Sequence, residues 1–244
     1  MNDFDRDKFF SLGFSLHYEI ISKTETLEER IFYINNAVDR KWDRDTLSEM
    51  LKAKLYEHQS QMPNNFLDTI PDSVKAIKAI DIFKDEYLLD YINVEEIGVR
   101  DMADIDERVI ENSIIMNIKN FITTFGQDFT FVGNQYHLEK YSTSQWTDLL
   151  FFNRELKALV CIELKRGPFK PAYLGQLSAY LRVLDSEIKK PDENPSIGIL
   201  LCKSADKAFV EFVIQGYNNP MGVATYKQKI IDVLPDEEEL KKLL

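Results

Sequence analysis

The chain of 244 residues carries 30 Lys and Arg against 41 Asp and Glu, a formal net charge of −11. This acidic balance argues against a protein that coats nucleic acid through bulk charge. Hydrophobic residues make up 44% of the chain, enough for a core, yet no apolar run approaches the ~20 residues that span a bilayer. The charged N-terminus lacks the order of a signal peptide, and Cys161 and Cys202 lie in apolar runs typical of buried thiols. We therefore expect a cytoplasmic protein without membrane contact.

Two adjacent helices are predicted near the N-terminus. Thr26 precedes residues 27–42 with a glutamate three positions later, the pattern of a capping box, and Asp43 precedes a second amphipathic segment over residues 44–57. A connection this short is compatible with half of a helix-turn-helix whose second helix carries basic residues, namely Arg44, Lys52 and Lys54. We favour a hairpin used for packing or dimerisation, because acidic residues on the same helix would face phosphates unfavourably.

The rest of the first hundred residues is predicted to contain a loop and one more helix. Two prolines mark residues 61–73 as a loop, and a helix is expected around residues 85–94. We place the boundary between a helical N-terminal domain, residues 1–100, and a second domain, residues 101–244, near residue 100.

The second half of the chain is rich in predicted strands. A helix over residues 104–126 ends at Gly126, a natural C-terminal cap. Further elements are expected in chain order: strands at 129–140, around 146–152 and around 156–167 with a turn at 153–155, a helix at 172–188, a strand at 195–204, a helix or strand at 207–217 and a strand at 222–227. This order predicts an α/β fold, a mixed sheet flanked by helices, preceded by a mostly helical N-terminal region.

Charged residues at the end of one predicted strand form the strongest candidate site. Side chains alternate along a strand, so Glu163 and Lys165 point to the same face. The hairpin brings Asp148 of the partner strand near them, and two close carboxylates repel unless a divalent cation lies between. Oxygen ligands, including the Leu164 carbonyl, suit Mg²⁺ or Mn²⁺. Lys165 would then stabilise charge on a phosphate or lower the pKa of an attacking water.

Other residues are candidates for the same site, although each could also have a purely structural role. Glu111, or Glu107 one turn earlier, could reach the metal from the helix before the sheet. The remaining candidates are Gln176 and Tyr180 on one helix face, Arg166 and Lys170 as phosphate contacts, and Glu139 after a strand. Each of these could instead be a solvated or packing residue, and a Glu–Lys pair alone is more often a surface ion pair.

The order Asp148, fourteen residues, Glu163-x-Lys165 is the signature of the PD-(D/E)XK nuclease superfamily. The stretches "FTFVGNQYHLE", "TDLLFFNRELKALVCIELKRGPFKPAYLGQLSAYL", "ENPSIGILLCKS" and "PMGVATY" resemble the nuclease domain of the YhcG-like bacterial family, from about residue 111 to 234. The resemblance implies a restriction-endonuclease-like fold. It implies the following roles: Asp148, Glu163 and Glu111 as metal-binding acids, Lys165 as the catalytic lysine and Gln176 as a substrate or positioning residue. Thr147 stands where the superfamily name has proline, which is not a ligand.

The N-terminal half also resembles the family. "EERIFYINNAVDRKWDRDTLSEMLKAKLYE" and "IFKDEYLLDYINV" are similar to its N-terminal domain from about the middle onward, so we expect a shortened form of that domain. The family domain is supposed to bind DNA, and this role is left open here.

The function expected from the sequence is magnesium-dependent, or manganese-dependent, hydrolysis of DNA by an endonuclease. The first alternative is a catalytically silent module that binds DNA or assembles with protein partners in a defence, repair or mobile-element complex. The second is a branched-DNA resolvase, which would require a homodimer presenting two sites to one junction.

Overall fold

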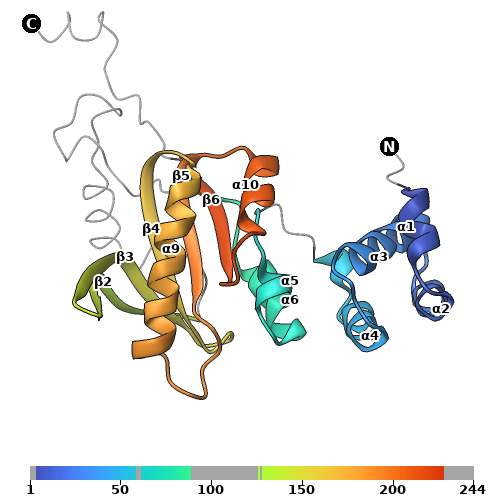
Figure 1. Cartoon of the computed structure of the whole chain (residues 1–244), viewed down its shortest axis with the longest axis horizontal. Helices are drawn as coiled ribbons and strands as arrows, with labels where there is room; N and C mark the ends of the chain where they lie inside the picture. The colour runs from blue at the N-terminus through green and yellow to red at the C-terminus, as the bar shows by residue number, and fades with distance from the viewer. Residues whose placement is uncertain (1–3, 59–61, 89–125, 127, 228–244) are drawn as a thin grey trace, which may run out of the picture.

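The structure is a computed structural model that describes residues 4–58, 62–88, 126 and 128–227. Figure 1 shows a group of N-terminal helices at one end of the molecule and a sheet with helices on both faces at the other. The predicted helix at 104–126 lies outside the described residues, except for Gly126.

The N-terminal helices are α1 (Arg6–Ser11), α2 (Phe14–Lys23), α3 (Leu27–Asp39), α4 (Arg44–Lys52) and the 3-10 turn η1 (Leu55–Glu57). Two of them, α3 and α4, begin after the capping residues expected from the sequence, Thr26 and Asp43. Thr26 accepts a hydrogen bond from the Glu29 N–H, and Asp43 accepts one from the Thr46 N–H. The helix predicted over residues 44–57 is shorter in the structure, where α4 ends at Lys52. It stops there because Lys54 adopts a left-handed backbone with φ of 54°.

Residues 62–88 differ from the sequence-based prediction. The predicted loop contains the short helix α5 (Phe66–Thr69), and α6 (Ser73–Ile82) follows it. The helix expected around residues 85–94 is wrong at its start, since β1 (Glu86–Leu88) is a strand parallel to β6 (Met221–Lys227). Tyr87 is buried there, so pairing and burial override local helical preference. The remainder of that predicted helix lies outside the described residues.

The sheet has six strands in the order β1-β6-β5-β4-β3-β2. Its other strands are β2 (Phe129–Lys140), β3 (Thr143–Asn153), β4 (Ala158–Pro168) and β5 (Ile197–Ser204). β2, β3 and β4 are antiparallel neighbours, whereas β4, β5, β6 and β1 are parallel. The predicted mixed sheet is therefore confirmed.

Helices cover both faces of this sheet. On one face, Ile162 of β4 belongs to a core that extends to α5, α6 and the N-terminal helices. On the other, Cys161 packs in a second core with α9 (Pro171–Val183), which continues as the π-helical turn η4 (Leu184–Ile188), and with α10 (Lys207–Ile214). The ambiguous segment at 207–217 is thus mainly helical. Both cysteines are buried and free.

Residues 62–88 are attached to the sheet by a buried asparagine. The Asn65 side chain donates to the carbonyls of Tyr217 and Asn219, each at 3.0 Å, and its Oδ1 accepts the Met221 N–H at 2.8 Å. The domain boundary near residue 100 falls among residues 89–125, outside the described residues. The sheet includes β1, which precedes that position.

Candidate active site

The candidate site lies where β3 and β4 separate. Their pairing extends from Asn153 opposite Ala158 to Leu149 opposite Ile162. Asp148 and Glu163 are the next residues of the two strands. Beyond this point β4 continues alongside β5, with Lys165 opposite Cys202. We call this divergence of β3 and β4 the fork; it lies beside Asp148 of β3 and Glu163 in the middle of β4.

Asp148 bridges the fork through its side chain. Its Oδ2 accepts a hydrogen bond from the backbone N–H of Leu164 at 2.7 Å. Gln135 of β2 lies 3.5 Å away, between its Nε2 and Asp148 Oδ1. This amide was not singled out from the sequence, where it stands in an ordinary strand pattern. Its left-handed backbone, with φ of 42°, distinguishes it only in the structure.

Glu163 and Lys165 share a face of β4, as the alternation predicts. Lys165 Nζ donates to Glu163 Oε1 at 3.0 Å, and both side chains are buried, with residue exposures of 2% for Glu163 and 8% for Lys165. Glu163 Oε2 is also buried and has no hydrogen-bond partner in the part of the chain that the structure describes. A buried carboxylate oxygen without a donor is costly, which indicates a missing positively charged or hydrogen-bonding partner.

The charges at the fork perturb the titration of Glu163. Burial and the Asp148 carboxylate raise its pKa, the Lys165 ammonium lowers it, and the net result is a pKa of about 7. The rise shows that the one amine does not offset the burial of Glu163 together with the nearby Asp148 carboxylate. A second cation would restore the balance.

These residues fit a magnesium ion. The donor set at the fork is two carboxylates with a free oxygen, the hard-ligand chemistry that Mg²⁺ and Mn²⁺ prefer. Within the described residues, no cluster of three or more His, Cys, Asp or Glu side chains could hold a metal. The third acid expected from the sequence, Glu111 or Glu107, lies outside the described residues.

Helix α9 covers the site from one side. Pro171 starts the helix at its first turn. Gln176 is exposed and donates to the hydroxyl of Tyr180, which is itself buried. Burial raises the pKa of Tyr180, and the charges of Glu163 and Asp148 act on it as well, so its hydroxyl lies within electrostatic reach of the acids.

An aromatic residue missed in the sequence lies beside the lysine. Lys165 Nζ is 5.4 Å from the ring centroid of Tyr173, a cation–π distance. Arg166 and Lys170, the predicted phosphate contacts, are exposed next to it. Tyr173 could have been found from the sequence, because it precedes Gln176 by three residues and side chains at this spacing share a helix face.

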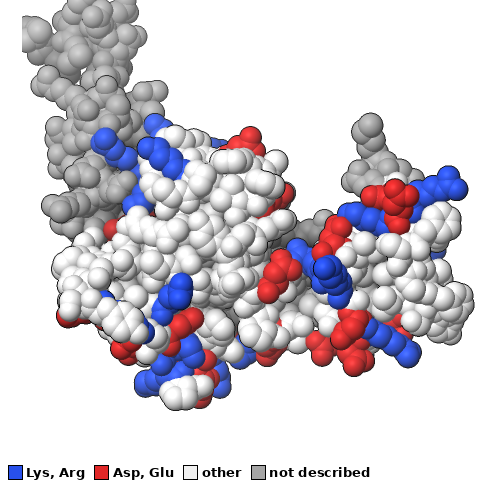
Figure 2. Space-filling model, in the orientation of Figure 1, with Lys and Arg blue, Asp and Glu red and all other residues white. Residues whose placement is uncertain are grey.

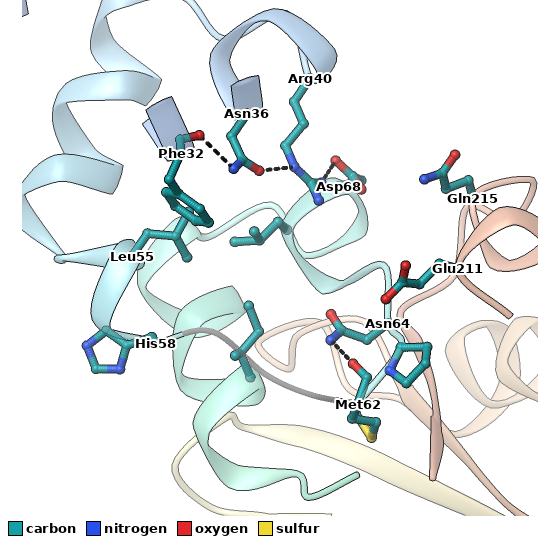
Figure 3. A pocket seen from close by; sticks show the side chains of 13 residues that line it. Phe32, Asn36, Arg40, Leu55, His58, Met62, Asn64, Asp68, Glu211 and Gln215 are labelled. Carbon is teal, nitrogen blue, oxygen red and sulfur yellow. Dashed lines mark hydrogen bonds and ion pairs between the residues drawn. The ribbon is translucent and has the colours of Figure 1, made fainter. Parts of the chain in front are cut away.

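Other candidates lie apart from the fork. Glu139 is exposed and pairs with Ser144 near the tip of the β2–β3 hairpin. A cavity of about 290 Å³ is lined by residues from 32–40, 55–68 and 211–215, with Ile80. In Figure 3, Arg40 joins Asn36 to Asp68 at this cavity. None of its lining residues belongs to the predicted site.

No helix of the described part is long and apolar enough to span a membrane.

Comparison with known families identifies the chain. The sequence profile described as "YhcG PDDEXK nuclease domain" matches residues 80–244, more than half of the chain. The chain belongs to the YhcG PDDEXK nuclease domain family. The Escherichia coli (strain K12) protein named "Putative nuclease YhcG" is 27% identical over 235 residues, which cover 96% of this chain and 60% of that protein. The chain thus spans less than two thirds of this family relative.

Solved structures match about half of this chain. A repair endonuclease from Pyrococcus abyssi is 15% identical with a TM-score of 0.36, and its match covers 52% of this chain and 47% of the other. EndoMS without ligand is 17% identical with a TM-score of 0.34, again covering 52% and 47%. Because these scores are low, we infer nothing further from them.

Proposed function

We propose that this chain is a metal-dependent nuclease that hydrolyses phosphodiester bonds in DNA, acting in the bacterial cytoplasm. The observation that carries the proposal is the arrangement at the fork. A buried oxygen of Glu163 receives no hydrogen bond within the described residues, and Asp148 and the amine of Lys165 lie beside this carboxylate. Membership in the PDDEXK family supports nuclease chemistry. A scaffold protein would gain nothing from burying Glu163 and Lys165 beside a second, half-buried acid, Asp148.

The proposed cofactor is Mg²⁺, with Mn²⁺ as a substitute. Asp148, Glu163, the Leu164 carbonyl and Glu111 are the residues that would hold it. When bound, the ion supplies positive charge that lets both carboxylates ionise and that stabilises charge on the phosphate.

The chain's own residues would act on the phosphate and the attacking water. Water adds to phosphorus while the bond from phosphorus to the leaving sugar oxygen breaks. Lys165 would donate hydrogen bonds to the negative phosphate oxygens, whose charge grows in the transition state. Gln176 would orient the substrate, and Arg166 and Lys170, with Tyr180, would bind the DNA near the site.

A cleavage assay with isosteric variants tests the proposal. The full chain is incubated with linear, nicked, single-stranded and branched DNA, with Mg²⁺, Mn²⁺ or EDTA. Asp148→Asn, Glu163→Gln and Lys165→Ala should each reduce cleavage by about 10²-fold or more, as expected for groups acting on the reacting phosphate. Asp192→Asn and Lys190→Ala, at exposed positions after α9, are matched controls that should cleave normally.

Two outcomes would contradict the nuclease. One is no cleavage of any substrate with either metal, and the other is full activity in the Glu163→Gln and Lys165→Ala variants. DNA binding that persists without cleavage would instead favour the silent binding module. Cleavage confined to branched DNA, by a protein that sediments as a dimer, would favour the resolvase.

A further inference from the structure

Amines and aromatic rings follow the candidate catalytic lysine on the segment from β4 to α9 and on α10. Tyr173 lies between two amines: Lys165 Nζ is 5.4 Å from its ring centroid and Lys170 Nζ is 6.0 Å from it. The Tyr173 ring therefore lies near both the buried amine of Lys165 and the exposed amine of Lys170.

A second ring, that of Phe169, precedes Lys170 in the chain and is held against the end of β5. The Phe169 N–H donates to the Ser204 carbonyl at 2.8 Å. Its ring lies 6.2 Å from the ring of Phe209 with an interplanar angle of 74°. The segment after β4 is thus fixed against the first turn of α10.

Helix α10 carries two exposed phenylalanines. Phe209 is 47% exposed and Phe212 is 76% exposed, and their i,i+3 spacing puts them on one helix face. Val210 and Ile214 on the other face are fully buried, so the exposed pair is not needed to dock the helix. We call Phe169, Tyr173, Phe209 and Phe212 the aromatic strip.

Basic residues accompany Phe169 and Tyr173 of the aromatic strip, although the whole chain is acidic. Between Leu164 and Leu184 the charged residues are Lys165, Arg166, Lys170 and Arg182, with no acid among them. Figure 2 shows blue side chains near the upper edge of the sheet, where Figure 1 draws the connection from β4 to α9. A polyanion would meet local positive charge here despite the net charge of −11.

We infer that the aromatic strip stacks unpaired bases, so that the substrate class of the proposed nuclease is DNA with a single-stranded segment. This inference rests on the proposed function. Exposed rings beside amines combine base stacking with phosphate contact, the mode by which proteins bind single strands. A duplex hides the faces of its bases within its own stack and offers the two phenylalanines nothing to stack on. The Tyr173 ring of the strip lies 5.4 Å from Lys165 Nζ, so a strand bound at this ring would lie beside the site.

The inference is tested by binding without cleavage. Fluorescence anisotropy in EDTA, at fixed low salt, measures the Kd of the full chain for labelled oligothymidylate, for an abasic strand of the same length and for a duplex. The double variant Phe209→Ala, Phe212→Ala should weaken oligothymidylate binding by about fivefold or more, the loss expected from stacking free energies. Binding of the abasic strand and the duplex should not change.

Three further variants separate stacking from other effects. Phe14→Ala removes a ring that is 86% exposed on the distant helix α2, and it should leave all three Kd values unchanged. Phe212→Trp keeps a ring and should retain tight binding. Lys170→Ala should weaken all three ligands alike, because it removes only charge.

The outcomes separate this inference from the proposed function. Equal wild-type affinity for oligothymidylate and the abasic strand, or an equal loss for all ligands in the double variant, would overturn the stacking surface while leaving any cleavage intact. Failure of the wild type to cleave DNA would overturn the nuclease, and the binding pattern would still report on the strip.

Discussion

The carboxylate of Asp148 accepts the backbone N–H of Leu164 at 2.7 Å, across the gap where β3 and β4 part. This bond ties one acid of the proposed metal site to the strand that carries the other. It replaces a ladder hydrogen bond that the diverging strands no longer make. Asp148 is therefore expected both to hold the fork together and to bind the ion.

Asp148→Asn should separate these two roles. The amide oxygen can still accept from Leu164, so the Tm should change little, whereas the lost charge should weaken Mg²⁺ or Ca²⁺ binding by tenfold or more. Asp148→Ala should lower both. Calorimetric titration with the ion and thermal unfolding check this, and an unchanged metal affinity in Asp148→Asn would remove Asp148 from the site.

The raised pKa of Glu163 predicts that the metal-free protein loses stability as pH rises. The folded-state pKa of about 7 lies above the ordinary glutamate value of 4.5, so between these values the folded state binds more protons than the unfolded chain. The free energy of unfolding should then fall from about pH 4.5 to 7, by on the order of 3 kcal/mol if Glu163 acts alone.

Urea unfolding in EDTA across that pH range measures this effect. Glu163→Gln should flatten the dependence, because the amide does not titrate. Added Mg²⁺ should restore stability at the upper end. A wild-type slope equal to that of Glu163→Gln would show that Glu163 does not titrate in this range.

Asn65 is expected to be a major contributor to stability outside the site. It is 2% exposed. Its side chain donates hydrogen bonds to the carbonyls of Tyr217 and Asn219 and accepts one from the N–H of Met221. Asn65→Ala leaves these groups buried without partners and should cost about 2–5 kcal/mol. Denaturant unfolding measures the cost, and Asn134→Ala, at an exposed strand position, should cost far less.

Gly198 is expected to tolerate no side chain. A Cβ at this position would lie 2.8 Å from Leu177 Cγ, a branch point that cannot swing aside within the packed α9–β5 core. Gly198→Ala should lower the free energy of unfolding by about 1–3 kcal/mol through overpacking. At Gly167 an added Cβ meets nothing within 4 Å, so Gly167→Ala is the matched control. Equal stability of the two variants would contradict the close contact.

Local patterns determined much of this protein. Caps and apolar periodicity depend on neighbours within a few residues, so the starts of α3 and α4 and the span of β2 could be predicted. Alternation along β4 put Glu163 and Lys165 on one face, and the hairpin brought Asp148 to them. These features need no knowledge of distant segments.

Tertiary structure alone decided the rest. β1 became a strand because β6, more than a hundred residues later, offered it a partner, and Tyr87 was buried in the process. Gln135 reached Asp148, and Phe209 reached Phe169, only once separate elements had packed. Contacts between residues far apart in the chain leave no periodicity to read, because their geometry is set by sheet order and helix packing rather than by spacing.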